Sequence, residues 1–385
     1  MKTILYGAFG RHNFGDMLFP HIVDNLIKEK SSKSNLEFCD ILSRDMREYG
    51  GHNVKSISDF FDYEKELNLI CVGGQTGGCG LQGAIQMFSA NDSHKSEINK
   101  LRNANINHAY LINKHKFKNP KMFVCNGIGG VGDGTFGIIK NFDYNSFRDK
   151  SSHLNYEGNR EALNQGTLGY HVPDSVVMLR HFFDEKIKNR LKQSNSLQNL
   201  NNLIGGNYIA VQFKPGQLGD CLDELKFQFN KIISDLNIPI VFFCAGVARG
   251  HDSVDEYKKI FDNSLPNEMV HYYDGENIWD ICNLISRAEC VIGTSLHVRV
   301  LASQYARPRI TINLQELNGS ETPQYTKTSY FINEWDSIKN SEMKMINLFE
   351  NVKESINQNN LEFQLEHNKK LQNIFLERSI WIEKI

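Results

Sequence analysis

The sequence predicts an α/β fold of two domains, each built on a parallel sheet, and three observations support this. Short apolar, β-rich runs alternate with longer stretches of helical spacing, which is typical of parallel strands joined by crossover helices. Glycine-rich turns follow several of the predicted strands. A segment rich in Lys, Asn, Gln and Ser interrupts the alternation. We therefore expect an N-terminal domain at 1–185, a linker region at 186–206 made of a helix and an exposed connection, a C-terminal domain at 207–330 and a helical tail at 331–385.

The first half opens with a predicted strand at residues 3–6. A helix is expected at 16–30, because its apolar residues recur at helical spacing. Further strands are predicted at 36–42, 67–72 and 121–125, since each is a short apolar run that ends in polar residues or glycine.

The second half repeats this alternation without repeating the sequence. Strands are predicted at 207–213, 238–243 and 290–292, and helices at 278–287 and 296–305. The tail that follows has helical periodicity, with an apolar stripe of the kind that packs against a domain.

Length and charge narrow the functional classes. The chain has 385 residues, the length of roughly two to three domains. Its 43 basic and 45 acidic residues nearly cancel, so a dedicated nucleic-acid binder, which needs a basic surface, is not expected. The first apolar run ends at Gly7, too early for a signal peptide, and no run reaches the length of a membrane helix. The eight cysteines form no Cys-x-x-Cys, which favours reduced thiols in a cytoplasmic protein.

Four glycine-rich turns stand at predicted strand ends, at residues 7–10, 73–78, 127–130 and 292–294. In open α/β sheets, ligands bind beyond the carboxyl ends of the strands, so these turns are expected to converge on a binding cleft. The alternative is that each glycine only tightens a strand-to-helix turn.

The first candidate site is the run Asn13-Phe14-Gly15-Asp16, which follows the first strand and opens the first helix. Asn13 is a suitable helix cap, and the backbone N–H groups of a first helical turn favour an anion. An acidic residue there also suits the helix dipole, so Asp16 has a structural explanation as well as a catalytic one.

The second candidate is Arg148, in the run Ser146-Phe147-Arg148-Asp149. Its planar guanidinium can hold a carboxylate or a phosphate through two hydrogen bonds. The alternative is an ion pair with Asp149 or with another neighbouring carboxylate.

The third candidate is the turn Gly293-Thr294-Ser295-Leu296-His297, which leads from a strand into a helix. His297 is the main acid/base candidate, because histidine exchanges a proton near neutral pH. Thr294, Ser295 and the start of the helix are candidates for phosphate binding. The alternative is a buried histidine with only structural hydrogen bonds.

No strong metal constellation is visible, and Walker A, His-Glu-x-x-His and Gly-x-Ser-x-Gly sequences are absent. The run Arg249-Gly250-His251-Asp252 follows a predicted strand and is either a metal or sugar contact or a surface loop. We therefore expect neither a metal nor a cofactor.

Taken in order, these motifs resemble those of the polysaccharide pyruvyl transferase family. The family shows an early Asn-x-Gly-Asp, a glycine-rich turn, a Ser-x-Arg-Asp element, a later Pro-Asp and a C-terminal Ser-x-Arg-Leu-His. The corresponding residues here are, in that order, 13–16, 73–74, 146–149, 173–174 and 293–297. The resemblance spans residues 3–315.

The resemblance implies two Rossmann-like domains facing a cleft, as in glycosyltransferase-B enzymes. It also implies transfer of a pyruvyl group from phosphoenolpyruvate, as co-substrate, to sugar hydroxyls as a ketal, in cell-surface polysaccharide biosynthesis. The residues expected to transfer protons are His297 and Asp16. The positions expected to bind the substrate anions are Asn13, Gly15, Gly74, Arg148, Thr294, Ser295 and Arg299.

One departure concerns the donor. Ser295 stands where the family has its hallmark arginine, which the resemblance implies should hold the phosphoenolpyruvate anion. Arg299 is the predicted replacement, because residues four apart share a helix face. If instead the donor is a nucleotide sugar, Glu316 is expected to contact its ribose.

Two other hypotheses therefore stand beside pyruvyl transfer. A glycosyltransferase with a nucleotide-sugar donor would use the same scaffold, and a non-catalytic sugar-binding or assembly protein would keep the fold alone. The expected partner is a sugar, a glycan or a lipid-linked glycan. The sequence leaves open a homo-oligomer and a peripheral association with the inner face of the membrane.

Overall fold

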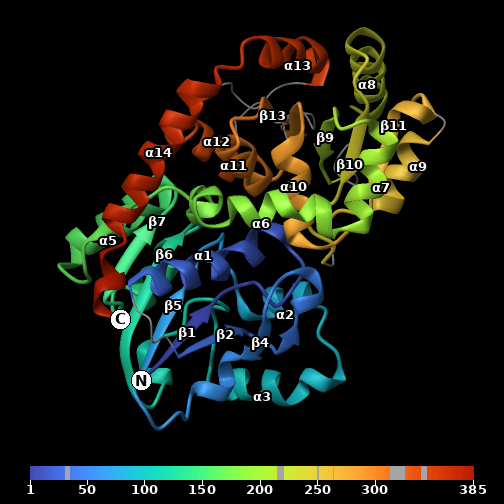
Figure 1. Ribbon diagram of the computed structural model, residues 1–385. Helices are drawn as coiled ribbons and strands as arrows, with labels where there is room; N and C mark the ends of the chain where they lie inside the picture. Colours follow the sequence, from blue (N-terminus) through green and yellow to red (C-terminus); the bar gives the residue numbers. More distant parts are fainter. Residues whose placement is uncertain (31–34, 215–220, 249–250, 263, 313–325, 340–344) are drawn as a thin grey trace. The chain divides into compact units, whose positions relative to one another are not determined.

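The chain folds into two compact units (Figure 1). The structure is a computed structural model and describes residues 1–385 except 31–34, 215–220, 249–250, 263, 313–325 and 340–344. Unit 1 comprises Met1–Met178 and Leu371–Ile385, and unit 2 comprises Leu179–Lys370. Each unit has its own sheet, so the predicted α/β class is confirmed.

Unit 1 is built on a mostly parallel sheet. Its described strands are β1 (Lys2–Tyr6), β2 (Leu36–Asp40), β3 (Arg44–Asp45), β4 (Asn53–Ser56), β5 (Leu67–Cys71), β6 (Pro120–Ile128), β7 (Tyr144–Phe147) and β8 (Gly169–His171). They lie in the order β3-β4-β2-β1-β5-β6-β7-β8, and only the β3–β4 pair is antiparallel. The chain thus leaves β1 for β2 on one side and later returns to β5 on the other. Such a switch point is where ligands bind in sheets of this class.

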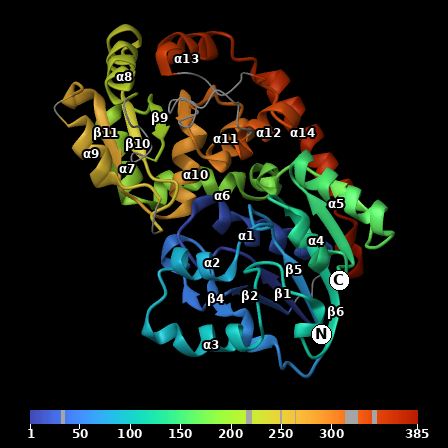
Figure 2. The same cartoon turned by 180° about the vertical axis from the view of Figure 1, so that it is seen from behind.

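Helices cover both faces of this sheet. The helices are α1 (Phe14–Lys30), α2 (Leu81–Phe88), α3 (Lys95–Asn103), α4 (Asp133–Ile139) and α5 (Lys150–Leu163). Apolar residues of α2 to α5 share one core with alternate residues of β1, among them Ile4 and Tyr6. Figure 2 labels these helices around the strands of unit 1. The buried residues of α1 lie outside that core; α1 packs instead with β1 and with the short 3₁₀ turns η5 (Ser175–Met178) and η11 (Ile380–Lys384).

Unit 2 has a smaller, wholly parallel sheet. Its described strands are β9 (Ile209–Gln212), β10 (Ile240–Phe243), β11 (Val270–Tyr273), β12 (Cys290–Gly293) and β13 (Arg309–Thr311), in the order β11-β10-β9-β12-β13. The chain runs outward from β9 through β10 to β11 and then returns to β12 on the other side of β9. The switch point of unit 2 therefore lies between β9 and β12.

The helices of unit 2 form two layers. They are α6 (Leu179–Gln193), α7 (Asn195–Ile204), α8 (Leu222–Leu236), α9 (Val254–Phe261), α10 (Ile278–Arg287), α11 (Leu296–Gln304), α12 (Lys327–Glu334), α13 (Leu348–Asn357) and the first part of α14 (Leu361–Arg378). Residues of α8, α9 and α13 share a core with the strands. Helices α6, α10 and α11 pack together outside that core.

Two predicted boundaries differ from the structure. The segment 186–206 contains the predicted helix but is not an exposed connection between the domains, because it lies within unit 2, where α6 and α7 occupy most of it and α7 buries Leu197 and Leu200. Its polar residues belong to the exposed faces of these helices. The residues at 331–385 do not form one tail either, since unit 1 takes up Leu371–Ile385.

Most predicted elements of the second half are present. Helix α10 has the predicted bounds, and α11 ends one residue before its predicted end. The sequence analysis missed the short strands β3, β4, β7, β8, β11 and β13. All eight cysteines are free thiols. None of the described helices is long and apolar enough to cross a membrane.

Candidate active site

In unit 1, the turns that follow β1 and β5 meet at the switch point. Asp16 is buried in the first turn of α1, and its Oδ2 lies 3.1 Å from Nη2 of Arg11. Gly74 has a φ of +98°, and a Cβ on it would stand 3.4 Å from Oδ1 of Asp16. The N–H of Met17 donates to the carbonyl of Asn13 at 3.0 Å, which places Asn13 at the start of the helix. The predicted site residues Asn13, Asp16 and Gly74 are thus brought together.

Arg148, at the end of β7, is held by residues of unit 1. Its Nη1 lies 2.6 Å from Oδ2 of Asp174, and both side chains are buried. Its Nη2 donates to Oε1 of Gln75 at 3.1 Å, which connects it to the glycine-rich turn after β5. Asp174 is thus an ion-pair partner of Arg148, and Asp149 caps α5. The ion pair offered as the alternative is present, and anion binding by Arg148 stays a prediction.

A third buried acid, Asp40, stands at the end of β2 in the same unit. Its Oδ2 accepts the N–H of Gly10 at 2.7 Å, and its Oδ1 accepts the N–H of Ile41 at 2.5 Å. Burial raises the pKa of Asp40 to about 7, although these hydrogen bonds and the charge of Arg11 act in the opposite direction. Asp40 therefore fixes the first glycine-rich turn and changes its charge near neutral pH.

In unit 2, Gln212 holds the turn between β12 and α11. Its backbone oxygen accepts the N–H of Thr294 at 3.1 Å, and its Oε1 accepts the N–H of Ser295 at 3.1 Å. Ser295 precedes the helix, and its side chain makes no capping hydrogen bond to it. His297 is buried in the first turn of α11. The predicted residues of the third motif thus lie together at the switch point of unit 2.

Asp252, in the segment between β10 and α9, binds Gln212 and so joins the turn that precedes α11. Its Oδ2 accepts from Nε2 of Gln212 at 2.7 Å and from the N–H of Ala245 at 2.9 Å. Burial raises the pKa of Asp252 to about 6, against the effect of its hydrogen bonds and of the positive charge of Lys214. Of the predicted run 249–252, Arg249 and Gly250 lie outside the described residues, and Asp252 contributes a buried carboxyl group.

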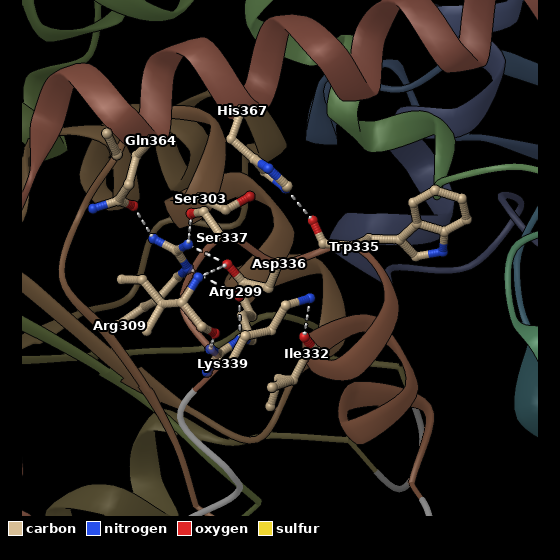
Figure 3. A network of polar contacts seen from close by, with 12 residues as sticks. Arg299, Ser303, Arg309, Ile332, Trp335, Asp336, Ser337, Lys339, Gln364 and His367 are labelled. Carbon is tan, nitrogen blue, oxygen red and sulfur yellow. Dashed lines mark hydrogen bonds and ion pairs between the residues drawn. The ribbon is translucent and has the colours of Figure 1, made fainter.

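Arg299 does not point to this group, contrary to the prediction that it replaces the hallmark arginine. Its Nε lies 2.7 Å from Oδ2 of Asp336, and its Nη1 donates to Oγ1 of Thr311 at 2.9 Å (Figure 3). The prediction assumed that Ser295 and Arg299 share a helix face. The N–H of Arg299 does donate to the carbonyl of Ser295 at 3.2 Å, as the four-residue spacing requires, but the guanidinium is held by Asp336 instead.

Asp336 also pairs with a second arginine. Arg309 forms an ion pair with Oδ1 of Asp336, and its Nη1 donates to Oε1 of Gln364 on α14 at 2.5 Å (Figure 3). Burial alone would raise the pKa of Asp336, but the charges of Arg309 and Arg299 hold it well below its usual range. Arg299 therefore has a structural role in unit 2.

The predicted proton-transfer residues belong to different units: Asp16 to unit 1 and His297 to unit 2. Glu316 lies outside the described residues. Within the part of the chain that the structure describes, no three His, Cys, Asp or Glu side chains are placed to hold a metal ion.

Comparison with known sequences decides the family. A family model described as polysaccharide pyruvyl transferase matches residues 13–316. The chain belongs to the polysaccharide pyruvyl transferase family. It is accordingly a transferase, and the hypothesis of a non-catalytic binding protein is not supported. No curated protein matches the chain significantly.

Solved structures similar to this family member show the same fold. The UDP-GlcNAc 2-epimerase of Neisseria meningitidis bound to UDP-GlcNAc has a TM-score of 0.58 at 9% identity, with 100% of this chain and 99% of that chain covered. The Rickettsia bellii UDP-N-acetylglucosamine 2-epimerase has a TM-score of 0.58 at 10% identity (99% and 95% covered). The α,α-trehalose 6-phosphate synthase of Burkholderia multivorans has a TM-score of 0.51 at 8% identity (100% and 95% covered). The glycosyltransferase-B-like architecture is thereby confirmed.

Sequence reasoning missed several residues of these groups. Arg11, Asp40 and Gln75 in unit 1, and Gln212 in unit 2, were not singled out. Each stands at or just after the carboxyl end of a strand, so strand-end position combined with a polar side chain was the available signal.

Proposed function

We propose that this transferase moves a pyruvyl group from phosphoenolpyruvate to two hydroxyls of a sugar, forming a ketal and releasing phosphate. Membership of the polysaccharide pyruvyl transferase family supports the proposal. The observation that carries it is the position of His297, which stands with Thr294 and Ser295 on the turn beside the β9–β12 switch point. Ligands of α/β sheets bind at this position.

The reaction sets clear chemical requirements. Two sugar oxygens bond to C2 of phosphoenolpyruvate, and the bond from C2 to the phosphate oxygen breaks. Of the two hydroxyl protons, one reaches the methylene carbon and the other leaves with the phosphate. The enzyme must therefore supply an acid for the methylene carbon, a base for the hydroxyls, and positive or N–H groups for the phosphate and the carboxylate.

Three residues of unit 2 are proposed to act on the donor, phosphoenolpyruvate, or to bind it. His297 is proposed to transfer the proton to or from the reacting atoms. The hydroxyls of Thr294 and Ser295, together with the N-terminal end of α11, are proposed to hold the donor anion. In unit 1, Asp16 is proposed as the second proton-transfer group and Arg148 as a further anion contact.

The decisive experiment mixes the full chain with phosphoenolpyruvate and a panel of glycans. Phosphate release is followed, and ketal-linked pyruvate is sought by mass spectrometry. His297→Ala should lower turnover by about 100-fold or more. Because His297 is buried, the unfolding free energy of the variant is measured beside its activity, so that a loss of fold is distinguished from a loss of catalysis. His271→Ala, which alters a histidine on the edge strand β11 of the same unit, is the matched control and should keep its activity. Near-normal turnover in His297→Ala would exclude the proposed role.

A second candidate function is glycosyl transfer from a nucleotide sugar. Ser295 in place of the hallmark arginine favours it, and the similar epimerase of known structure is bound to UDP-GlcNAc. Calorimetric titration with phosphoenolpyruvate and with a set of nucleotide sugars separates the two. Binding of a nucleotide sugar without binding of phosphoenolpyruvate would favour this candidate, and binding of phosphoenolpyruvate alone would exclude it.

A further inference from the structure

We propose that Asp252, acting through Gln212, is the positioning residue for the turn that carries Thr294, Ser295 and His297. The inference deepens the proposed function and rests on it for its kinetic test. Its structural test needs no substrate. Gln212 and Asp252 make no predicted contact with the reacting atoms, so their effect must reach the reaction through the turn.

Gln212 fixes the two residues before α11 in two different ways. Its backbone oxygen holds Thr294, and its side-chain oxygen holds Ser295. In the β9–β12 pairing, Gln212 also lies directly opposite Gly293. An amide accepts only at its oxygen and donates only at its nitrogen, so Ser295 is held only while Oε1 faces it.

Asp252 selects that orientation of the amide. An ionised carboxylate has no proton to donate, so Asp252 can bind Gln212 only through Nε2. The N–H of Ala245 fixes the same carboxylate oxygen to the end of β10. The hydrogen bonds therefore run from the end of β10 through Asp252 and Gln212 to Ser295, across three neighbouring strands.

Both side chains of this pair are buried, which makes a charge on Asp252 unfavourable for stability. Asp252 is 8% exposed and Gln212 is 3% exposed. Among the described residues, no cation lies within ion-pair distance of Asp252. Lys214 and Glu256 act on it by charge from farther away, and the other titratable groups beside it are those of Tyr257 and Cys244.

A buried carboxylate without a paired cation destabilises a fold. An asparagine at position 252 would keep an oxygen for Ala245 and Gln212 without carrying the charge. A carboxyl group whose pKa is perturbed by burial at a strand-end turn is typical of a functional site.

The structural test measures hydrogen–deuterium exchange of the backbone N–H groups in the full chain. Gln212→Leu should increase the exchange rate of the fragment 290–299, because Ser295 loses its acceptor. The matched control is Gln228→Leu in α8, which removes another buried glutamine that accepts a backbone N–H, that of Phe349, at 2.9 Å. Unchanged exchange in Gln212→Leu, or an equal increase in Gln228→Leu, would overturn the proposal.

The kinetic test uses a charge swap. Gln212→Glu sets two carboxylates against each other and should lower kcat by about tenfold or more above neutral pH, with partial recovery at lower pH, where the pair can share a proton. Adding Asp252→Asn restores a donor opposite the new carboxylate, so the double variant should return kcat to within about threefold of the original chain with KM unchanged.

The outcomes of the two tests are separable. If the double variant restores slow exchange at Ser295 but not kcat, the carboxylate of Asp252 acts on the reaction directly, and the positioning role is refuted. If the unaltered chain transfers no pyruvyl group to any acceptor, the proposed function fails. The exchange rates of Gln212→Leu and Gln228→Leu then still decide whether Gln212 holds the turn.

Discussion

Among the buried aspartates of unit 2, Asp252 and Asp336 lie in opposite electrostatic surroundings. Asp336 lies between the guanidiniums of Arg299 and Arg309, which hold its pKa well below the usual range despite its burial. Asp252 accepts hydrogen bonds from an amide and a backbone N–H, and burial raises its pKa to about 6. One carboxylate is paired with cations, and the other has no cation within ion-pair distance in the part of the chain that the structure describes.

This difference in pairing gives Asp336 and Asp252 different interpretations. A carboxylate between two arginines ties β13, α11 and the segment after α12 together, and removing its charge leaves the arginines uncompensated. The carboxylate of Asp252 has no such partner among the described residues, and it lies beside a predicted catalytic turn. We therefore interpret the paired carboxylate as part of the framework of unit 2, and Asp252, which has no paired cation among the described residues, as part of the proposed site.

The largest expected effect is at the paired carboxylate. Asp336→Asn should lower the unfolding free energy by about 3–5 kcal/mol, because it leaves two buried guanidiniums without their counter-charge. Urea unfolding followed by circular dichroism measures this loss. A loss below about 1 kcal/mol would mean that the network is not what holds these elements together.

The pH dependence at Asp336 has a definite sign. Because the pKa of Asp336 is lowered in the folded chain, its stabilising contribution is complete at neutral pH and is lost only as the pH falls well below the usual carboxyl range.

A smaller effect of opposite sign is expected at Asp252. Its folded pKa, about 6, lies above the ordinary value of 3.8, so the folded chain loses stability as the pH rises between these values. Asp252→Asn removes this penalty. From about pH 4 to about pH 7, the unfolding free energy of the variant should gain on the order of 2 kcal/mol relative to the original chain.

Unfolding curves at several pH values in matched buffers provide the measurement. Lys214, Glu256, Tyr257 and Cys244 are the charged and titratable groups that act on Asp252, and all are unchanged in the variant. A difference that stays constant across the pH range would show that Asp252 is not perturbed by burial, and the contrast with Asp336 would disappear.

These contrasts show how far the sequence could predict the molecule. The alternation of strands and helices predicted the α/β class, and the turn at 293–297 was recognised because glycine, hydroxyl groups and histidine follow a strand directly. The role of Arg299 could not be predicted in the same way, since its partner Asp336 lies 37 positions farther along the chain. Nothing local distinguishes an arginine that binds a ligand from one that meets a distant carboxylate.

The segment 186–206 shows a second limit: polar composition suggests an exposed connection even where the chain folds into helices. A polar segment with Lys, Asn, Gln and Ser suggested an exposed connection at 186–206, yet α6 and α7 bury one apolar side each there. The signal was present in the spacing of Leu197 and Leu200 and in Ser194, which caps α7. Tertiary packing decides whether such a weakly amphipathic stretch folds, and composition alone does not record it.

The smallest expected effect compares two serines that stand before helices of unit 2. Ser194 caps α7 by accepting the N–H of Leu197 at 3.3 Å, and its hydroxyl donates to Asp280 at 2.7 Å. Ser295 stands at the same position before α11 but makes no capping hydrogen bond. Ser194→Ala should therefore lower the unfolding free energy by about 1–2 kcal/mol, and Ser295→Ala by less than about 0.5 kcal/mol.

Thermal unfolding of both variants, each beside a titration with phosphoenolpyruvate, tests this difference. If Ser295→Ala weakens binding without destabilising the fold, the hydroxyl serves the ligand; an equal loss of stability in both variants would assign Ser295 to the framework.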